Sequence, residues 1–286
     1  MKRFIVGLLF LASLSTQAGF FDTTWNRDSY AWQTNIITSG GTISVSSYLT
    51  GVRFINQVQQ WGIRSRIGRA NLYLGDQTNA MCCPIITDWS GGAPAVINDD
   101  LIAFVAADYS EATGLTGNTS TKYLRCSKAT GLGISTFTVH TNLHMAVYVR
   151  TASNEASDEM GVAFAGTGNY GIAAGNGGST YIFMGLNTPS TANTNAGFVL
   201  STRTASNAAV TYKNGTAVVT DNTADGGSLA SGFLVVHAFN SAGTVGGFDS
   251  RPLSYYAVGL SISSTLQSPY RIAVRNVQLA KGRNVE

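Results

Sequence analysis

Acidic side chains are the first residues of this sequence that could do chemistry, because a β-rich enzyme that cleaves glycans needs two carboxylates facing each other across a cleft. On one strand such carboxylates would stand two residues apart, since alternate residues share a face. The nearest approach is NEASDEM, where Glu155, Asp158 and Glu159 have a spacing that does not fit one strand face. The segment is typical of a turn, so we predict a solvated loop, no catalytic residue and no enzymatic activity.

Histidines are the next candidates, as zinc ligands. His140 and His144 are four positions apart, but Thr141 stands where a metalloprotease helix has Glu. Their context favours a strand, on which they would lie about 13 Å apart and could not share one zinc ion without a bend. We predict no metal site here, and a hydrogen-bonded core histidine at His237.

Aromatic and amide side chains in loops could bind a sugar, since an aromatic face packs against C–H groups and amides bond to hydroxyls. The glycine-dense stretch GTGNYGIAAGNGG contains Tyr170 and Asn176, and TDWSGGAP contains Trp89. Each has a structural alternative: a loop between strands for the first stretch, and a cap on the core for Trp89. We take Trp89, Tyr170 and Asn176 as the candidate ligand-binding residues.

Several aspartates fall in stretches typical of loops, where carboxylate oxygens could bind Ca²⁺. They are Asp99, Asp100, Asp221, Asp225 and Asp249. None has the spacing of a calcium-binding loop. We therefore expect no metal ion and no cofactor.

The cysteines number three, Cys82, Cys83 and Cys126. Adjacent cysteines cannot readily bridge each other without strain, and an odd number does not indicate a disulfide framework. One long-range bridge to Cys126 from either of the other two is an alternative. We favour three small buried residues.

The composition favours strands and turns. Charged residues make up 12% of the chain, about half the roughly 25% of an average soluble domain, and Gly, Ser, Thr and Asn supply the polarity instead. A net charge of +3 is too small to indicate a nucleic-acid partner. The basic cluster GIRSRIGR, with Arg64, Arg66 and Arg69 on a predicted helix, suits a solvated helix face or a contact between subunits.

The first segment, residues 1–19, has a basic start, an apolar run and then small residues. This order is typical of a signal peptide, and the run is short for a membrane span. Two alternatives stay open: a cleaved signal peptide, or a retained apolar anchor that packs into a neighbouring subunit of a virus particle.

Helical spacing follows in residues 20–70. SYAWQTNIITSGG predicts a short helix or strand broken at Gly40 and Gly41. Apolar side chains then recur at the period of one helix of about five turns, at Val52, Ile55, Val58, Ile63 and Ile67. We predict a polar arm and a docking helix in this part of the chain.

From Leu72 onward the apolar period changes to two, with Gly, Asn and Ser clusters between the segments. Strands without intervening helices predict an all-β, antiparallel sandwich or jelly roll over residues 71–268, as one main domain. Asn214 and Gly215 in VTYKNGTAVV predict a tight hairpin of the mirror-image turn type. Residues 269–286 form either a closing helix after Pro269 or a last strand and tail.

A longer pattern resembles a known family. DYSEATGLTGNTSTKYLR, followed some twenty residues later by HMAVYVRT, is similar to phage tail-associated proteins with a laminin-G-like, concanavalin-type jelly roll. The matches to the family's Gly-Leu-x-Gly-Asn-x-Ser-Thr-Lys-Tyr-Leu run are Gly114, Leu115, Gly117, Asn118, Ser120, Thr121, Lys122, Tyr123 and Leu124. SGGTISVSS and STRTASNAAVTYKNGT extend the resemblance over about residues 34–263.

The resemblance implies that this run forms an early strand pair of the sandwich, and Asn118 and Ser120 suit a turn whose side chains bond nearby backbone. It implies a virion structural protein, such as a tail fibre, a spike or a capsid-decorating subunit, that binds other virion subunits, with host-surface polysaccharide as a further partner. A homo-oligomer fits such a role. The alternative is a secreted bacterial lectin or adhesin.

Overall fold

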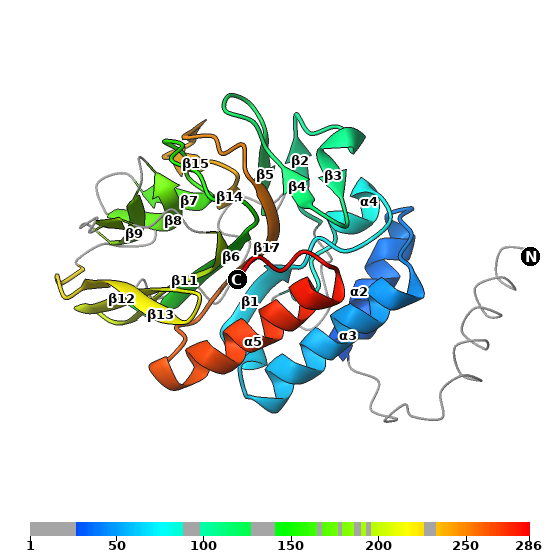
Figure 1. Cartoon of the computed structure of the whole chain (residues 1–286), viewed down its shortest axis with the longest axis horizontal. Helices are drawn as coiled ribbons and strands as arrows, with labels where there is room; N and C mark the ends of the chain where they lie inside the picture. Colours follow the sequence, from blue (N-terminus) through cyan, green and yellow to red (C-terminus); the bar gives the residue numbers. More distant parts are fainter. Residues whose placement is uncertain are drawn as a thin grey trace, which may run out of the picture.

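The computed structural model describes residues 27–87, 98–126, 141–164, 168–176, 179–185, 190–192, 196–225 and 233–286. In these residues two β-sheets pack as a sandwich, and helices cover the outer face of one of them (Figure 1). The prediction of a mostly β-sheet sandwich with few helices is confirmed. The jelly-roll identity of the sandwich is still a prediction.

The helical elements are α2 (Arg27–Thr38), α3 (Val45–Gln60), α4 (Thr78–Met81) and α5 (Ser264–Ala280), with the 3₁₀ turns η1 (Arg64–Arg66) and η2 (Ala106–Asp108). Ser44 caps α3, since its Oγ accepts the Ser47 amide at 3.2 Å. The predicted helix is confirmed but shorter than expected, because Gly62 adopts a left-handed φ of 69° and turns the chain out of the helix.

The first sheet contains β1 (Ile67–Asn71), β3 (Tyr109–Ser110), β4 (Gly114–Thr116), β6 (Leu143–Val149), β11 (Gly197–Ala205), β12 (Ala208–Lys213), β13 (Thr216–Asp221) and β17 (Pro252–Gly259). Its order is β13-β12-β11-β6-β17-β4-β3, and β1 also pairs with β17. These pairs are antiparallel. Since β1 begins at Ile67, the sandwich starts inside the segment predicted as the docking helix.

The second sheet contains β2 (Asp100–Ile102), β5 (Tyr123–Arg125), β7 (Met160–Phe164), β8 (Gly168–Asn176), β9 (Ser179–Gly185), β10 (Ser190–Ala192), β14 (Val235–Val236), β15 (Phe239–Ser241) and β16 (Thr244–Gly246). Its order is β10-β9-β8-β7-β14-β5-β2. The short hairpin of β15 and β16 joins it through a parallel pairing of β15 with β7.

Two apolar layers hold these parts together. Between the sheets lie side chains such as Val147, Ile172 and Val236. Between the first sheet and the helices lie others such as Phe54 and Tyr148. Val147 and Tyr148 are neighbours on β6 and enter different layers, because successive strand residues point to opposite faces. Figure 1 shows α3 and α5 side by side across the first sheet.

The predicted hairpin is confirmed. Asn214 and Gly215 join β12 to β13 with φ values of 49° and 86°, the two left-handed positions that a mirror-image turn requires. Asn214 also fixes the turn to the neighbouring strand β11, because its Oδ1 accepts the Phe198 amide at 2.8 Å.

The family-like run folds differently from the implied strand pair. Its first part forms β4 in the first sheet and its last part forms β5 in the second sheet, so the run crosses between the layers. The predicted turn is confirmed: the Asn118 Oδ1 accepts the amides of Ser120, Thr121 and Lys122 at 3.1, 2.8 and 2.8 Å.

At the C-terminal end, the helix alternative is correct, but α5 begins at Ser264 and carries Pro269 inside it. The SYAWQTNIIT segment is also helical, as part of α2. In the described part of the chain, no helix has both the length and the apolarity needed to cross a membrane.

Candidate functional site

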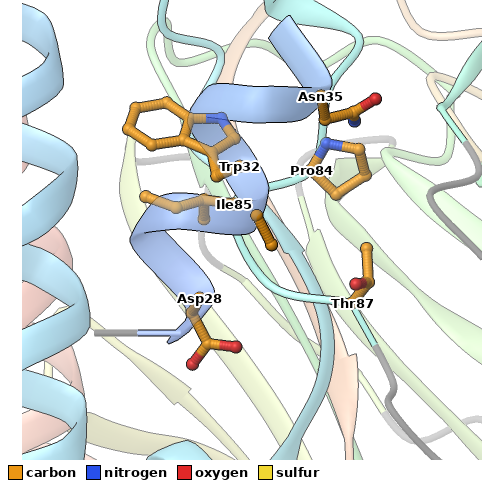
Figure 2. A pocket seen from close by; sticks show the side chains of 7 residues that line it. Asp28, Trp32, Asn35, Pro84, Ile85 and Thr87 are labelled. Carbon is orange, nitrogen blue, oxygen red and sulfur yellow. The ribbon is translucent and has the colours of Figure 1, made fainter. Parts of the chain in front are cut away.

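A small groove lies between α2 and the chain segment that precedes residue 88 (Figure 2). Its lining residues are Asp28, Ala31, Trp32, Asn35, Pro84, Ile85 and Thr87. The Trp32 ring stacks on Tyr48 with centroids 6.1 Å apart, and its indole N–H donates to the Cys83 carbonyl at 3.2 Å. The tryptophan therefore forms a rigid wall of the groove.

The charged and amide groups of the groove already have partners. Asp28 accepts two hydrogen bonds from Arg64, at 2.5 and 2.7 Å. Asn35 donates to Asn98 Oδ1 at 2.7 Å. The groove thus offers apolar edges and the half-buried Thr87 rather than a free charge, and this surface suits a small neutral group.

Of the three candidate ligand-binding residues, only Tyr170 has a side chain that the structure describes. Trp89 lies in residues 88–97, outside the described residues, so its role stays a prediction. Asn176 ends β8, where its backbone pairs with Ser179 of β9. Asn176 therefore lies at the end of a strand, next to the connection to β9. Its role in binding stays a prediction.

The structure contradicts the prediction that Tyr170 binds a ligand. Its side chain is 1% exposed and belongs to the apolar layer between the sheets. Its hydroxyl donates to the Asp225 carboxylate at 2.7 Å, and burial together with this carboxylate raises the pKa of the phenol. The ring cannot stack on a sugar from this position, because the β8 register turns it inward.

A buried cluster of charged residues is centred on Arg251. Its Nε donates to Asp249 Oδ1 at 2.7 Å and its Nη2 to Ser157 Oγ at 3.1 Å. The guanidinium also contacts the Glu159 carboxylate and the Ala174 carbonyl. Two distant parts of the chain, one with Ser157 and Glu159 and one with Ala174, therefore meet at the cation of the Asp249–Arg251 segment. We call this group the Arg251 cluster.

Burial shifts the titration of this cluster. The pKa of Glu159 is raised to about 7 by burial, only partly offset by Arg251. Burial, with the nearby Asp249 charge, also raises the pKa of Asp158 to about 7. Burial lowers the pKa of Lys213 to about 8 and that of His237 to about 4.

The cluster overturns two predictions. Glu159 is fully buried, not part of a solvated loop, because Arg251 and the Ala174 amide hold its carboxylate, the latter at 2.6 Å. His237 is a core histidine as predicted, but its ring nitrogens make no hydrogen bond among the described residues. The Asp249 carboxylate lies 3.7 Å from its Nδ1.

Asp99 and Asp221, two of the other loop-like aspartates, are also internal partners, whereas Asp100 pairs with Arg125 and is partly exposed. Asp99 is buried and accepts from Arg69 at 2.7 Å, from the Tyr256 hydroxyl at 2.6 Å and from Asn71 at 2.8 Å. Asp221 pairs with Arg203 at 3.2 Å. The prediction of Arg69 on a solvated helix face is therefore wrong, because this residue lies on β1 and points into the protein.

His144 is buried beneath α5. Its Nδ1 lies 2.6 Å from the Leu260 carbonyl and its Nε2 lies 3.4 Å from the Tyr270 hydroxyl. Burial lowers the pKa of its ring to about 4. His140 falls outside the described residues. Within the described ranges, no three His, Cys, Asp or Glu side chains gather in a way that could hold a metal ion.

The three cysteines are free thiols. The long-range bridge is therefore not formed, and Cys83 and Cys126 are buried, as the favoured alternative predicted. Cys82 is half-buried.

Comparison with known proteins gives similarity of structure only. No protein-family model and no curated protein sequence matches the chain. Among solved structures, the botulinum neurotoxin serotype D binding domain is 9% identical, with a TM-score of 0.48 over 74% of this chain and 51% of that one. The receptor binding domain of the botulinum neurotoxin C/D mosaic serotype is 10% identical, with a TM-score of 0.47 and the same coverage.

A sialidase from Trypanosoma rangeli, in complex with 2,3-difluorosialic acid, is 11% identical, with a TM-score of 0.45 over 75% of this chain and 33% of that one. The chain thus spans about half the length of the neurotoxin domains and about a third of the sialidase. Identities and TM-scores this low carry no argument about function.

Proposed function

We propose that this chain is a virion structural protein of a bacteriophage: a tail-fibre, spike or capsid-decorating subunit. In this proposal the concanavalin-like, laminin-G-like jelly roll faces outward and binds host-surface glycans, while the helical layer docks to other virion subunits or to further copies of the chain. The resemblance of the sequence to phage tail-associated proteins supports the proposal, and so does the distribution of apolar side chains on the surface.

That distribution is the observation that carries the docking role. Among the described residues, the exposed large apolar side chains gather on the helices: Tyr30 and Ile37 on α2, Val45 on α3, and Ile272 and Leu279 on α5. Two others, Val105 and Val285, lie elsewhere. Single apolar residues on a surface are ordinary, but their concentration on one layer favours an interface.

The glycan-binding role draws on the opposite sheet. The sequence of residues 165–196, which includes β8 and β9, is rich in Gly, Ser, Thr and Asn, and β8 ends at Asn176. Neutral amides and hydroxyls suit a sugar, whose own hydroxyls both donate and accept. Binding at one such site would be weak, and many copies on a particle would strengthen it through multivalency.

We propose a binding rather than a catalytic role, because the buried acids are committed to internal partners. Arg251 holds both Glu159 and Asp249, and neither faces a groove. Product analysis after incubation with host polysaccharide tests this part. The proposal predicts intact polysaccharide, and shortened chains would contradict it.

The source and mass of the native chain test the location. We expect the full-length chain in purified virus particles, with residues 1–19 kept as an anchor. A chain about eighteen residues short, found in the culture medium, would instead identify a signal peptide and favour the alternative of a secreted bacterial lectin or adhesin.

A glycan array tests the binding role separately. We expect the wild-type chain, displayed in many copies, to retain a defined set of bacterial surface glycans, and Asn176→Ala to weaken that retention. Gln60→Ala, which removes an exposed amide from α3 in the helical layer, is the matched control. No retention on any surface glycan would leave a purely structural subunit and contradict the binding role.

A further inference from the structure

Cys82 and Cys83 are consecutive, and both thiols point at one backbone oxygen. The Cys82 Sγ lies 3.3 Å from the Asn79 carbonyl oxygen, and the Cys83 Sγ lies 3.2 Å from the same atom. On a strand these side chains would point to opposite faces. Here the Cys82 amide donates to the Thr78 carbonyl at 3.0 Å, so the helical turn of α4 continues and keeps both sulfur atoms on one side.

The end of α4 explains why a carbonyl is available to the thiols. The Cys83 amide donates to the Ala80 carbonyl at 3.1 Å, one residue short of the α-helical partner. The Asn79 carbonyl therefore faces the two S–H groups. A further oxygen borders the pair, since Ser39 Oγ lies 3.7 Å from the Cys83 Sγ.

The two thiols also act on each other. A hydrogen bond between them is the largest cause of both shifts: it raises the pKa of Cys82 and lowers the pKa of Cys83. Cys82 is half-buried, and the chain continues from Cys83 into Pro84 and Ile85 of the groove in Figure 2.

We propose that Cys82 and Cys83 form a vicinal dithiol site that chelates one thiophilic centre, of the class of monovalent copper or trivalent arsenic. Sulfur ligands select soft centres of this kind, and two sulfur atoms held on one side of a turn can bind the same atom. This site is independent of the proposed virion function.

The reaction with a trivalent arsenical needs no oxidant. With phenylarsine oxide, two S–H bonds break, two As–S bonds form, and the arsenic-bound oxygen leaves with both protons as one water molecule. Arsenic keeps its oxidation state. A disulfide between the same residues would require an oxidant and a strained ring of adjacent residues.

The test is the intact mass of the reduced full chain after incubation with one equivalent of phenylarsine oxide. We expect one phenylarsine adduct per chain that withstands an excess of a monothiol and is released by 2,3-dimercaptopropanol. If a monothiol removes the adduct, or if no adduct forms, the proposal is overturned, and this result needs only the wild-type chain.

Variants locate the site. We expect Cys82→Ser and Cys83→Ser each to lose the monothiol-resistant adduct, while Cys126→Ser, the matched control, keeps it. An adduct that persists in Cys82→Ser would overturn the assignment. Anaerobic competition with bicinchoninate then tests whether the site also binds monovalent copper. Uptake of one copper ion per chain, lost in Cys83→Ser, would show that it does. No uptake would restrict the site to trivalent arsenic.

Discussion

At the scale of the residue, several of the few charges of this protein are buried and paired. Arg251, Arg69 and Arg203 each bind at least one buried carboxylate. Such pairs are costly to desolvate, and breaking one by removing a partner leaves an uncompensated buried charge. Asp99, Asp221, Asp249 and Glu159 are therefore parts of the fold.

The Arg251 cluster gives the first prediction. Arg251→Met removes the cation between Glu159 and Asp249, and we expect the free energy of unfolding to fall by about 3–5 kcal/mol near pH 8. The loss should be smaller near pH 5, because the pKa of Glu159 is raised to about 7 and the protonated acid carries no charge to bury. Urea denaturation at both pH values measures it.

Arg53→Met is the control, because Arg53 is exposed on α3. It should change stability little at either pH. A larger loss for Arg251→Met at pH 5 than at pH 8 would contradict the account of this cluster.

His144 gives a second prediction that depends on pH. Its folded pKa is lowered to about 4 from an ordinary 6.5, so its contribution is present above pH 6.5 and is lost as the pH falls toward 4. His144→Asn should remove this dependence, by about 1.4 kcal/mol per pH unit at most. The measurement is the free energy of unfolding of wild type and variant between pH 7 and pH 4.5. Two curves that run parallel over this range would contradict the prediction.

At the scale of the element, close packing of α2 on α3 reverses an ordinary preference. Gly51 lies inside α3, where alanine is normally better by about 1 kcal/mol. A Cβ there would lie 2.4 Å from Cζ3 of the Trp32 ring. We therefore expect Gly51→Ala to lower the melting temperature, while Gln60→Ala, on the exposed side of α3, should not. A more stable Gly51→Ala chain would contradict the packing.

The hairpin between β12 and β13 gives a second element-scale prediction. Gly215 has a φ of +86°, and a Cβ there would lie 3.2 Å from Arg271 of α5. We expect Gly215→Ala to cost about 1–2 kcal/mol, because L-residues other than Asn rarely adopt this conformation. Gly246→Ala is the control, because position 246 has open space around it and no positive φ. Thermal unfolding of both variants measures the effect. An equal loss of stability in the two variants would contradict the role of Gly215 in the turn.

The elements show what the sequence can predict. The α3 helix, the Asn214–Gly215 turn and the Asn118 turn were predictable, because their signals lie within a few residues. The start of β1 at Ile67 and the placement of β4 and β5 in different sheets were not, because they depend on distant pairings such as Ile67 with Gly259. The burial of Glu159 likewise depends on Arg251, which also binds Ser157 across 94 positions of the chain.

The candidate site was less predictable than the fold. Tyr170 and Asn176 were chosen from a glycine-dense stretch, but the strand period within it places Tyr170 on the inward face, in the same layer as Ile172. That period was visible in the sequence as alternate residues. The vicinal thiols were visible too, but their common direction depends on the α4 turn and could not be inferred from two adjacent letters.

At the scale of the whole molecule, the proposed function depends on the two outer faces of the sandwich being different. One carries α2, α3 and α5 with their exposed apolar side chains. The other belongs to the second sheet, in which β8 ends at Asn176. A subunit that docks through the first and presents the second would need this asymmetry.

A photo-activatable amino acid at position 37 of α2, introduced in cells that assemble the native particle, tests that central claim most directly. Thr244, exposed on the β15–β16 hairpin, takes the same residue as the control. We expect a covalent product with another particle subunit or a second copy from position 37 and none from position 244. A product from position 244 alone, or none from position 37, would contradict it.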